Sequence, residues 1–321
     1  MEQYDVCALG ELLIDFTQAG TSSKGNPLME ANPGGAPCNV LACLTKMGHS
    51  AAFIGKVGKD GFGDQLESAL KECGIATEGL LRDPVVHTTL AIVHTQPDGD
   101  RDFSFYRKPG ADMMLCEEEL KEEMIRNSRI FHFGSLSMTD EPCRTATRKA
   151  ISLAKEAGIL RSFDPNLREP LWDSLDLAKE QILYGLAHCD ILKISDNEIQ
   201  WLSGKSDYDD GIHWLREQFD IPLILLSMGK DGSRAYHNDL RVEVSAFHLD
   251  NTIETTGAGD TFLGGILHYV LNNGWKTYDE LELRDMLTFA NAAAALITTK
   301  SGALRVMPSL EEVEELLRRK E

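Results

Sequence analysis

The chain has 321 residues, about twice the length of a typical domain, so it can form one large α/β domain or two smaller ones. Hydrophobic residues make up 42% and charged residues 26%, which suffices for a large core and argues against wholesale disorder. The 32 Lys and Arg residues against 51 Asp and Glu residues give a net charge of −19. This charge disfavours nucleic acid or an anionic membrane surface as the main partner, whereas a small anionic ligand can bind where helix N-termini, basic side chains or a metal ion assist.

Three features predict a cytoplasmic location. No run approaches the roughly 18 consecutive apolar residues of a membrane span. The acidic start, residues 1–5, lacks the basic residues of a secretory signal. The seven cysteines are scattered without a CxxC pair, which favours free thiols in a reducing compartment over disulfides or a zinc site.

Apolar runs alternate with amphipathic stretches along most of the chain. Strands are predicted at Tyr4–Leu9, Ala51–Gly55, Arg129–Phe133, Ile159–Phe163, Asp190–Ile194 and Pro222–Ser227. Helices are predicted at Ala36–Met47, Phe62–Cys73, Arg144–Ala157, Leu175–Ala187, Phe262–Leu271, Leu287–Ile297 and Leu310–Leu317. This alternation predicts an α/β fold with a parallel sheet and helices on both faces. No linker rich in Pro, Gly or Ser divides the chain, so we expect residues 1–321 to form a single domain.

Two further segments interrupt the alternation. Thr88–His94 and Asp102–Tyr106 flank the turn Gln96-Pro97-Asp98-Gly99-Asp100, which is typical of a hairpin. Leu12–Thr17 and Leu28–Ala31 can form another pair of strands around a flexible connection. Together they predict either a small antiparallel flap beside the main sheet or a plain surface hairpin.

The segment Thr255-Thr256-Gly257-Ala258-Gly259-Asp260 leads directly into a predicted helix. Small residues at this position leave the first N–H groups of the helix exposed, together with the positive end of its dipole, which makes an anion site. Asp260 could take a proton from a hydroxyl that attacks a bound phosphoryl group. The alternative is that Thr256 or Asp260 only caps the helix.

Two polar segments could hold an acceptor molecule. Asn32-Pro33-Gly34-Gly35-Ala36-Pro37-Cys38-Asn39 allows close approach of the backbone to a ligand, and Asn39 offers both a donor and an acceptor, although a simple Gly-rich turn also explains it. Asp164-Pro165-Asn166-Leu167-Arg168 follows a predicted strand, at the edge where parallel sheets bind ligands. An Asx-turn with a solvated Arg explains this segment equally well.

Two more segments fit the nucleotide side of such a site. Ser227-Met228-Gly229-Lys230-Asp231-Gly232 follows a strand and suits a base or ribose edge, or a tight turn. Glu198 could orient magnesium-bound water, or it could simply complement a helix dipole. The chain contains neither a GxxxxGK[ST] motif nor an HExxH motif, which argues against a P-loop enzyme and a zinc protease.

Taken together, these residues resemble the ribokinase-like carbohydrate kinases (the PfkB family), most closely the fructokinases, over essentially the whole chain. The N-terminal signature matches from Gly34-Gly35 through Asn39, Gly48 and Gly58, and the C-terminal signature matches 255–260 through 264–267. Segments 105–112, 163–168 and 193–196 are similar to the fructokinase branch. The chain departs from the family pattern at Leu41, at Glu254, where Asp is common, and at Ser195, where the family has Asn.

The resemblance implies a ribokinase-like parallel sheet flanked by helices, with a small β-sheet lid from about 12–33 and 87–108. It implies transfer of the ATP γ-phosphoryl group to the C6 hydroxyl of D-fructose, with Asp260 as the base and Gly257, Ala258 and Gly259 as the anion hole. The residues implied for the sugar are Asp15, Gly34, Gly35, Asn39, Arg107 and Arg168, and those for ATP are Lys193, Ser227, Gly229, Gly232 and Asn291. Glu198 would act through Mg²⁺ and water, a K⁺ site would lie near Glu254, and the lids would pair into a homodimer.

Two other functions remain open on the sequence. Arg107 and Arg168 could grip a carboxylate, as bidentate guanidinium groups do, which would suit 2-keto-3-deoxygluconate as the acceptor. A protein that senses a sugar or a nucleotide without turnover is the alternative outside the enzymes. The intact Asp260 argues against it, because a pure binder needs no base there.

Overall fold

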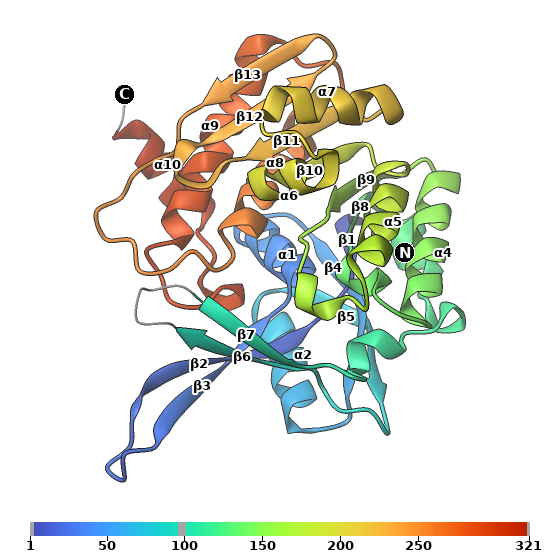
Figure 1. The fold of residues 1–321 in the computed structure, drawn as a ribbon, viewed down its shortest axis with the longest axis vertical. Coiled ribbons are helices and arrows are strands. Elements are labelled where there is room, and N and C mark those ends of the chain that lie inside the picture. Colours follow the sequence, from blue (N-terminus) through green and yellow to red (C-terminus); the bar gives the residue numbers. More distant parts are fainter. Residues whose placement is uncertain (1–2, 96–100, 320–321) are drawn as a thin grey trace.

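A large sheet crosses the centre of the molecule (Figure 1). The computed structural model describes residues 3–95 and 101–319, and in this part of the chain the sheet has nine strands in the order β13-β12-β11-β10-β9-β8-β1-β4-β5. Their bounds are β1 (Tyr4–Leu9), β4 (Ala51–Gly58), β5 (Ile75–Asp83), β8 (Ser128–Gly134), β9 (Leu160–Asp164), β10 (Ile191–Ser195), β11 (Leu223–Ser227), β12 (Ser233–His237) and β13 (Leu240–Val244). Because β1 lies between β8 and β4, the order of the strands reverses there.

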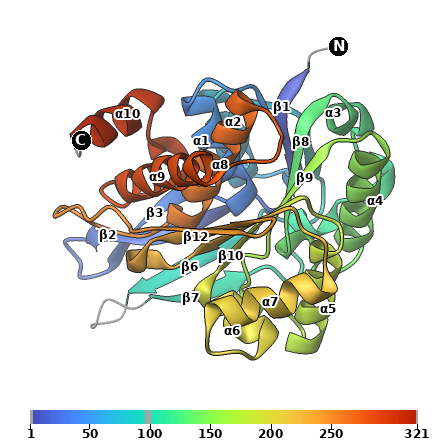
Figure 2. The same ribbon diagram turned by 90° about the horizontal axis from the view of Figure 1, so that it is seen from above.

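Helices cover both faces of this sheet, as the sequence predicts (Figure 2). One face carries α1 (Ala36–Lys46), α2 (Gly61–Glu72), α8 (Ala258–Asn273), α9 (Glu280–Ile297) and α10 (Leu310–Arg318). The other carries α3 (Glu122–Arg126), α4 (Cys143–Glu156), α5 (Leu175–Leu186), α6 (Asp196–Ser203) and α7 (Tyr208–Gln218). Successive strand residues face opposite cores, so Val6 packs beneath the first set of helices and Cys7 beneath the second.

The sheet is mostly parallel, which confirms the predicted fold class, but its edge at β11–β13 is antiparallel. β11 pairs with β12, and β12 with β13, in antiparallel register. The physical reason lies in the connection 228–232, which closes a hairpin with a hydrogen bond from Met228 N to Gly232 O of 2.8 Å and is far too short for a crossover. The edge strand β5 also has no counterpart among the predicted strands, because its partly exposed residues do not form an apolar run.

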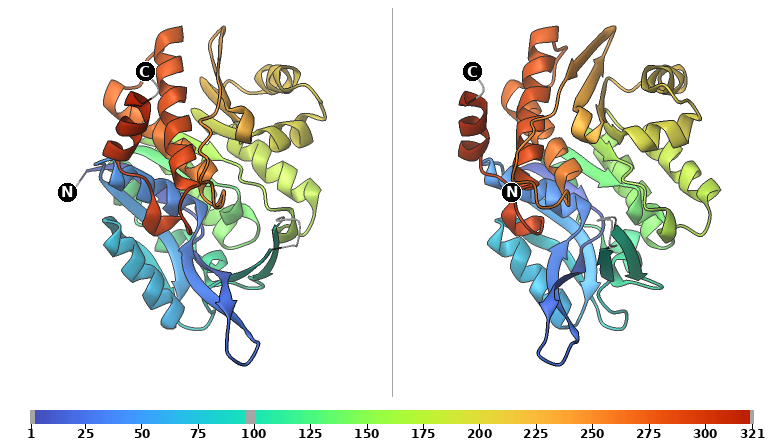
Figure 3. Two further views of the ribbon diagram at one scale, coloured as in Figure 1. Left: turned by 90° about the vertical axis from the view of Figure 1, so that its left-hand side faces the viewer. Right: turned by 60° about the vertical axis from the view of Figure 1, so that its left-hand side comes forward.

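A second, smaller sheet projects from one side of the body (Figures 1 and 3). It consists of β2 (Leu13–Thr21), β3 (Pro27–Gly34), β6 (Leu90–Thr95) and β7 (Arg101–Tyr106), in the order β3-β2-β6-β7. The flap is confirmed, but it is mixed rather than antiparallel, because β2 and β6 pair in parallel. Both strands leave the same edge of the main sheet, after the parallel strands β1 and β5, and therefore run in the same direction. The predicted turn Gln96–Asp100 lies outside the described residues.

The helices of the described residues also bear on membrane association. Within residues 3–95 and 101–319, none of them combines the length and the apolar character that crossing a membrane requires.

Gly185 allows α5 to pack closely on the sheet. A Cβ atom at this position would lie 2.4 Å from the ring of Phe163, which is fully buried and stacked on Phe133 with 4.8 Å between the ring centroids. We therefore expect Gly185→Ala to lower the free energy of unfolding by roughly 1–3 kcal/mol through overpacking, measured as a lower Tm.

Gly61→Ala is the matched control, because a Cβ at Gly61 meets no atom within 4 Å. Alanine also favours a helix over glycine, so this variant should keep or raise Tm. Equal Tm values for the two variants would contradict close packing of α5 on Phe163.

Candidate active site

A cavity of about 360 Å³ opens beside the carboxyl ends of the parallel strands, on the side of the switch point at β1. Residues from both halves of the chain and from the lid sheet surround it. They are Glu11, Leu13, Asp15, Gly35, Ala36, Asn39, Phe105, Leu136, Asn166, Arg168, Lys193, Thr255, Thr256, Gly257, Gly259 and Asp260. The predicted base, part of the predicted anion hole and most of the predicted sugar residues are therefore brought together.

The N-terminus of α8 forms one wall of this cavity. Gly257 is the N-cap residue, has a left-handed φ of 76° and offers no side chain to cap the helix. The N–H of Ala258 donates to the Thr255 carbonyl at 3.2 Å, so the backbone turn satisfies this group. The other N–H groups of the first turn point toward the N-terminal end of the helix, where its dipole adds positive potential for an anion. The interpretation of Asp260 as a mere cap does not apply, since Asp260 lies inside the first turn.

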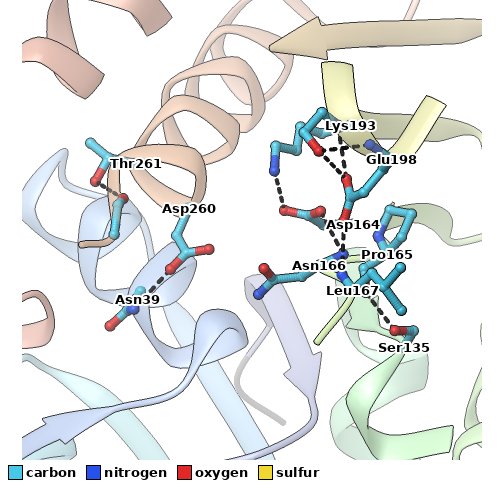
Figure 4. Close-up of polar contacts among 12 residues, drawn as sticks. Asn39, Ser135, Asp164, Pro165, Asn166, Leu167, Lys193, Glu198, Asp260 and Thr261 are labelled. Carbon is cyan, nitrogen blue, oxygen red and sulfur yellow. Dashed lines mark hydrogen bonds and ion pairs between the residues drawn. The ribbon is translucent and has the colours of Figure 1, made fainter. Parts of the chain in front are cut away.

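Asp260 is partly buried in this wall, and Asn39 donates from Nδ2 to its Oδ2 at 2.8 Å (Figure 4). Burial raises the pKa of Asp260, while the hydrogen bond from Asn39 and the charges of Lys193 and Arg168 lower it. The oxygen of the Asn39 amide, Oδ1, is buried and has no hydrogen-bond partner among the described residues. Asn39 thus orients the carboxylate and leaves one acceptor for a ligand hydroxyl.

A second buried charge cluster lies across from Asp260 (Figure 4). Lys193 Nζ is 3.0 Å from Asp164 Oδ2, and both side chains are at most 7% exposed. Burial lowers the pKa of Lys193, but the carboxylates of Asp164 and Glu198 raise it by more. A Cβ at Gly259 would lie 3.1 Å from Lys193 Nζ. An ammonium group therefore lies directly beside the helix N-terminus, which glycine at 259 permits.

Gly34 and Gly35 lack side chains that would clash with the Asp15 carboxylate and with the backbone near the start of α1. A Cβ at Gly34 would lie 2.3 Å from Asp15 Oδ2, and a Cβ at Gly35 would lie 2.3 Å from the carbonyl oxygen of Glu11. Gly35 also has a φ of 137°, which side chains rarely tolerate. Burial raises the pKa of Asp15 to about 7, helped by the charges of Asp260 and Glu254 and opposed by Arg168.

The two arginines predicted for the sugar lie in different places. Arg168 lines the cavity. Arg107 does not: it is only 3% exposed, and its guanidinium donates to Asp112 at 2.8 Å, to Thr139 Oγ1 at 2.9 Å and to the Leu136 carbonyl at 2.9 Å. The role predicted for Arg107 in sugar binding therefore has no support in its position, because these internal partners orient its side chain.

A second cavity of about 300 Å³ lies on the other side of the 255–258 turn. Thr255 lines both cavities, so the segment at the N-terminus of α8 lies between them and borders each one. Of the residues predicted for ATP, Gly229 and Asn291 line this second cavity, and so does Ala258 of the predicted anion hole. The sequence did not single out the wall from Ala246 to Leu249, which has no recognisable motif.

The remaining residues predicted for ATP build the walls around the two cavities. Ser227 ends β11, and Gly232 allows the following strand to pass under Val244, whose carbonyl oxygen would lie 2.2 Å from a Cβ at 232. Asn291 receives a hydrogen bond from Ser233 Oγ at 2.9 Å and donates to the carbonyls of Val244 and Ser245, both at 3.2 Å. Its amide therefore fastens β12 and the end of β13 to α9.

The carboxylates of the site do not form a direct metal cage. Among residues 3–95 and 101–319, no three His, Cys, Asp or Glu side chains are arranged to hold a metal ion. Glu198 Oε1 accepts from Leu167 N, and Oε2 accepts from Ser195 N and Oγ, each at 2.8 Å. This capping box fits a water-mediated contact to Mg²⁺, which usually retains several waters, rather than direct coordination.

Sequence reasoning missed Glu11 and the full role of Asp164. Glu11 is 4% exposed, lines the cavity and accepts from Ala36 N at 2.8 Å. Burial raises the pKa of Glu11 to about 7 and that of Asp164 to about 6. The position of Glu11 just after β1 was an available signal, since ligands bind at the carboxyl ends of parallel strands.

Fold and site thus define an α/β protein in which a partly buried acid adjoins an anion-binding helix N-terminus between two cavities. The model of the pfkB family of carbohydrate kinases matches residues 3–310, so the chain belongs to this family. The family that the resemblance predicted is therefore confirmed.

Several relatives and solved structures are similar over nearly the full length. Probable fructokinase-4 of Arabidopsis thaliana is 42% identical over 315 residues, covering 98% of this chain and 96% of the relative. Fructokinase-2 of Solanum lycopersicum is 41% identical, with the same coverage. The crystal structure of fructokinase with bound ATP from Xylella fastidiosa matches with a TM-score of 0.90 and 30% identity, covering 99% of both chains. Fructokinase from Vibrio cholerae O395 with fructose, ADP and calcium ion bound matches with a TM-score of 0.88 and 29% identity, covering 98% and 100%.

The raised pKa of Asp15 predicts a pH dependence of stability. This carboxyl has a pKa of about 7 in the folded chain and about 4 when unfolded, so between these values the folded chain binds the extra proton. The stability contributed by Asp15 is therefore full at low pH and is lost as the pH rises through about 7. We expect the Tm of the wild type, relative to that of Asp15→Asn, to fall between pH 5 and pH 8.

Asp220→Asn is the control for this comparison, because Asp220 is an exposed carboxylate outside the site. Its Tm difference from the wild type should hardly change over the same range. A wild-type to Asp15→Asn difference that is equally flat would contradict the raised pKa.

Proposed function

We propose that this protein is an ATP-dependent fructokinase that phosphorylates the C6 hydroxyl of D-fructose. The observation that carries the proposal is the position of Asp260, in the first turn of α8, beside an uncapped helix N-terminus that faces two cavities. The names of the relatives and the fructose-bound and ATP-bound similar structures support this substrate pair.

In the proposed reaction the acceptor oxygen of fructose attacks the γ-phosphorus of ATP. The new bond forms between that oxygen and phosphorus, the bond from phosphorus to the β,γ-bridging oxygen breaks, and its electron pair leaves with ADP. The proton of the hydroxyl passes to the Asp260 carboxylate. The N–H groups at 257–259 receive the charge that develops on the phosphoryl oxygens, and positioning supplies much of the rate.

Cationic side chains complete the phosphate side of the site. Lys193 Nζ lies beside Gly259 and is held by Asp164, so it is placed to contact the phosphates of ATP. Arg168 lines the same cavity and acts on the pKa of both Asp15 and Asp260. We assign Lys193 to ATP and Arg168 to the boundary between sugar and phosphate.

The opposite side of the same cavity would hold the sugar. Asp15 accepts hydrogen bonds from hydroxyls when ionised, and the unpartnered Oδ1 of Asn39 accepts another. Gly34 and Gly35 act through the backbone, since they make room for Asp15 and for the start of α1. The second cavity, with Gly229 and Asn291 on its walls, would hold the nucleotide.

Two ions belong to the proposal. Mg²⁺ would travel with the ATP phosphates and reach Glu198 through water, where it neutralises phosphate charge. K⁺ would bind near Glu254, beside a small cavity of about 30 Å³ whose lining combines the oxygen-bearing Asp15, Thr17, Glu254 and Thr256 with the apolar Pro33, Val93 and Ala303. Glu254 Oε1 accepts a hydrogen bond from Gly302 N at 2.9 Å. The Glu254 side chain is longer than that of the Asp usual in the family, and it reaches the segment that contains Gly302.

The competing functions lose their main support. The alternative of a 2-keto acid requires both arginines to bind its carboxylate. Only Arg168 lines the cavity, whereas Arg107 donates to Asp112 and its neighbours. A sensor without turnover would not need a partly buried acid that Asn39 orients beside an anion site.

The small sheet would act as a lid over the sugar, and its edge would form a dimer. Phe105 of β7 and Leu13 of β2 line the sugar cavity, so the sheet shields this cavity from water. The edge strand β3 exposes Leu28 by 49% and Met29 by 38%. An edge strand with exposed apolar side chains is prone to pair with another chain.

The first experiment measures ADP release with Mg-ATP and potassium against fructose, 2-keto-3-deoxygluconate and ribose. We expect turnover on fructose above the others. Asp260→Asn should lower kcat by about 10²–10⁴-fold, because a positioned base is lost, and should leave fructose binding near the wild-type level.

Asp220→Asn removes a carboxylate from the exposed surface and serves as the matched control, with kcat unchanged. An Asp260→Asn enzyme with wild-type kcat would refute the base. Turnover on the keto acid instead of fructose would refute the substrate.

The dimer prediction is tested by Leu28→Asp. A charge at this edge should disfavour pairing of the lids and convert a dimer into monomers of 35.6 kDa, measured by light scattering after size-exclusion chromatography. Leu281→Asp places the same charge on α9, where Leu281 is 66% exposed, and should keep the dimer. A monomeric wild type, or a Leu28→Asp dimer, would overturn the lid interface.

A further inference from the structure

The four strands of the lid sheet join the body at two roots, each formed by the ends of one pair of strands. Glu11 lies shortly before β2, and Ala36 lies shortly after β3. Thr89 directly precedes β6, and Arg107 directly follows β7. We call Thr89, Arg107 and Asp112 the root cluster, because hydrogen bonds between their side chains connect β6 and β7 to each other and to the body.

One buried carboxylate fastens the root of β6 and β7. Asp112 accepts from Arg107 Nε at 2.8 Å through Oδ2, and from the hydroxyl of Thr89 through Oδ1. Arg107 and Asp112 are each 3% exposed, so the ion pair is shielded from solvent. Asp112 lies in a short 3₁₀ helix, Ala111–Met114, that packs against β4 of the main sheet. The ends of both strands are therefore tied to the body at one point.

A second buried carboxylate fastens the root of β2 and β3. Glu11 Oε1 accepts from Ala36 N at 2.8 Å, and the Glu11 carbonyl lies where a side chain at Gly35 would have to be. Burial raises the pKa of Glu11, and the charge of Arg107 lowers it by a smaller amount.

The root cluster also reaches the rim of the sugar cavity. Arg107 donates to the Leu136 carbonyl at 2.9 Å and to Thr139 Oγ1 at 2.9 Å. Leu136 and Glu11 both line that cavity, whereas Arg107 does not. A guanidinium can make these contacts together because its donors form a rigid planar fork.

We propose that Arg107 is a positioning residue for phosphoryl transfer: through Asp112, Thr139 and Leu136 it holds the root of β6 and β7 against the rim of the sugar cavity, so that the lid keeps water away from the transferred phosphoryl group. This inference rests on the proposed function. It gives Arg107 a task other than direct sugar binding. Water that enters a kinase site competes with the sugar as acceptor, so poor positioning of the lid appears as ATP hydrolysis.

The test is Arg107→Lys, which keeps the positive charge but lacks the fork. ADP and fructose 6-phosphate are measured in the same reaction. The wild type should form them in nearly equal amounts, with only a small background rate of ATP hydrolysis, and the variant should raise this background rate about tenfold, as the loss of one charge-assisted contact predicts. A one-to-one ratio with a raised KM for fructose would overturn the proposal in favour of a direct sugar contact. A one-to-one ratio with only a lower Tm would overturn it in favour of a purely structural role.

Thr89→Val keeps the proposal testable if Arg107→Lys fails to fold. This variant removes only the hydroxyl that donates to Asp112, which is a smaller change than the loss of an ion pair. Thr89 does not line the sugar cavity. We expect excess ADP in the same direction, and a ratio equal to that of the wild type would overturn the proposal.

Lys108→Met is the matched control, because Lys108 is the next cation in the chain and its side chain is 73% exposed beside Asp173. It should keep the one-to-one ratio, and excess ADP from this control would overturn the specific role of Arg107. A wild type that forms no fructose 6-phosphate would refute the proposed function itself, an outcome distinct from excess ADP in the variants.

Discussion

The rest of the proposed site depends on one constraint, which is to keep the Asp260 carboxylate ionised although the protein largely shields it from solvent. Burial favours the neutral acid, and a neutral acid cannot accept the proton of an attacking hydroxyl. The hydrogen bond from Asn39 and the charges of Lys193 and Arg168 all favour the ionised form. These groups come from α1, from β10 and from the loop after β9, so the sheet and the helical layer that contains α1 and α8 must be in place before Asp260 can act as the proposed base.

The same constraint explains why so many other charges are buried nearby. Lys193 beside the helix N-terminus would be costly to bury alone, and Asp164 and Glu198 compensate its charge. Glu198 is itself held by three donors, so the cluster does not collapse onto the cavity. Glycine at 259 gives the ammonium group room at the α8 N-terminus, and glycine at 34 gives the Asp15 carboxylate room on the sugar side. Small residues and buried charges are therefore parts of one arrangement.

The lid follows a similar logic at its roots. Each pair of strands is fastened to the body by one buried carboxylate, Asp112 for β6 and β7 and Glu11 for β2 and β3. Arg107 acts electrostatically on both, which explains why an arginine expected in the sugar cavity lies beside it instead. A lid attached in this way is positioned relative to the same rim that Asp15 and Asn39 help to form.

The sequence by itself determined the features that depend on neighbouring residues. These are most of the strands and helices, the uncapped Gly257 turn before α8 and the close backbone approach at Gly34 and Gly35, because periodicity, helix capping and glycine conformations are local. Only the tertiary structure decided what depends on distant segments. The hydrogen bond between Asn39 and Asp260 joins residues 221 positions apart. The hydrogen bonds from Arg107 to Leu136 and Thr139 join the end of β7 to the segment after β8. The parallel pairing of β2 with β6 joins strands that no short turn connects. No local pattern encodes these pairings, since they arise from the packing of the whole sheet and its helices.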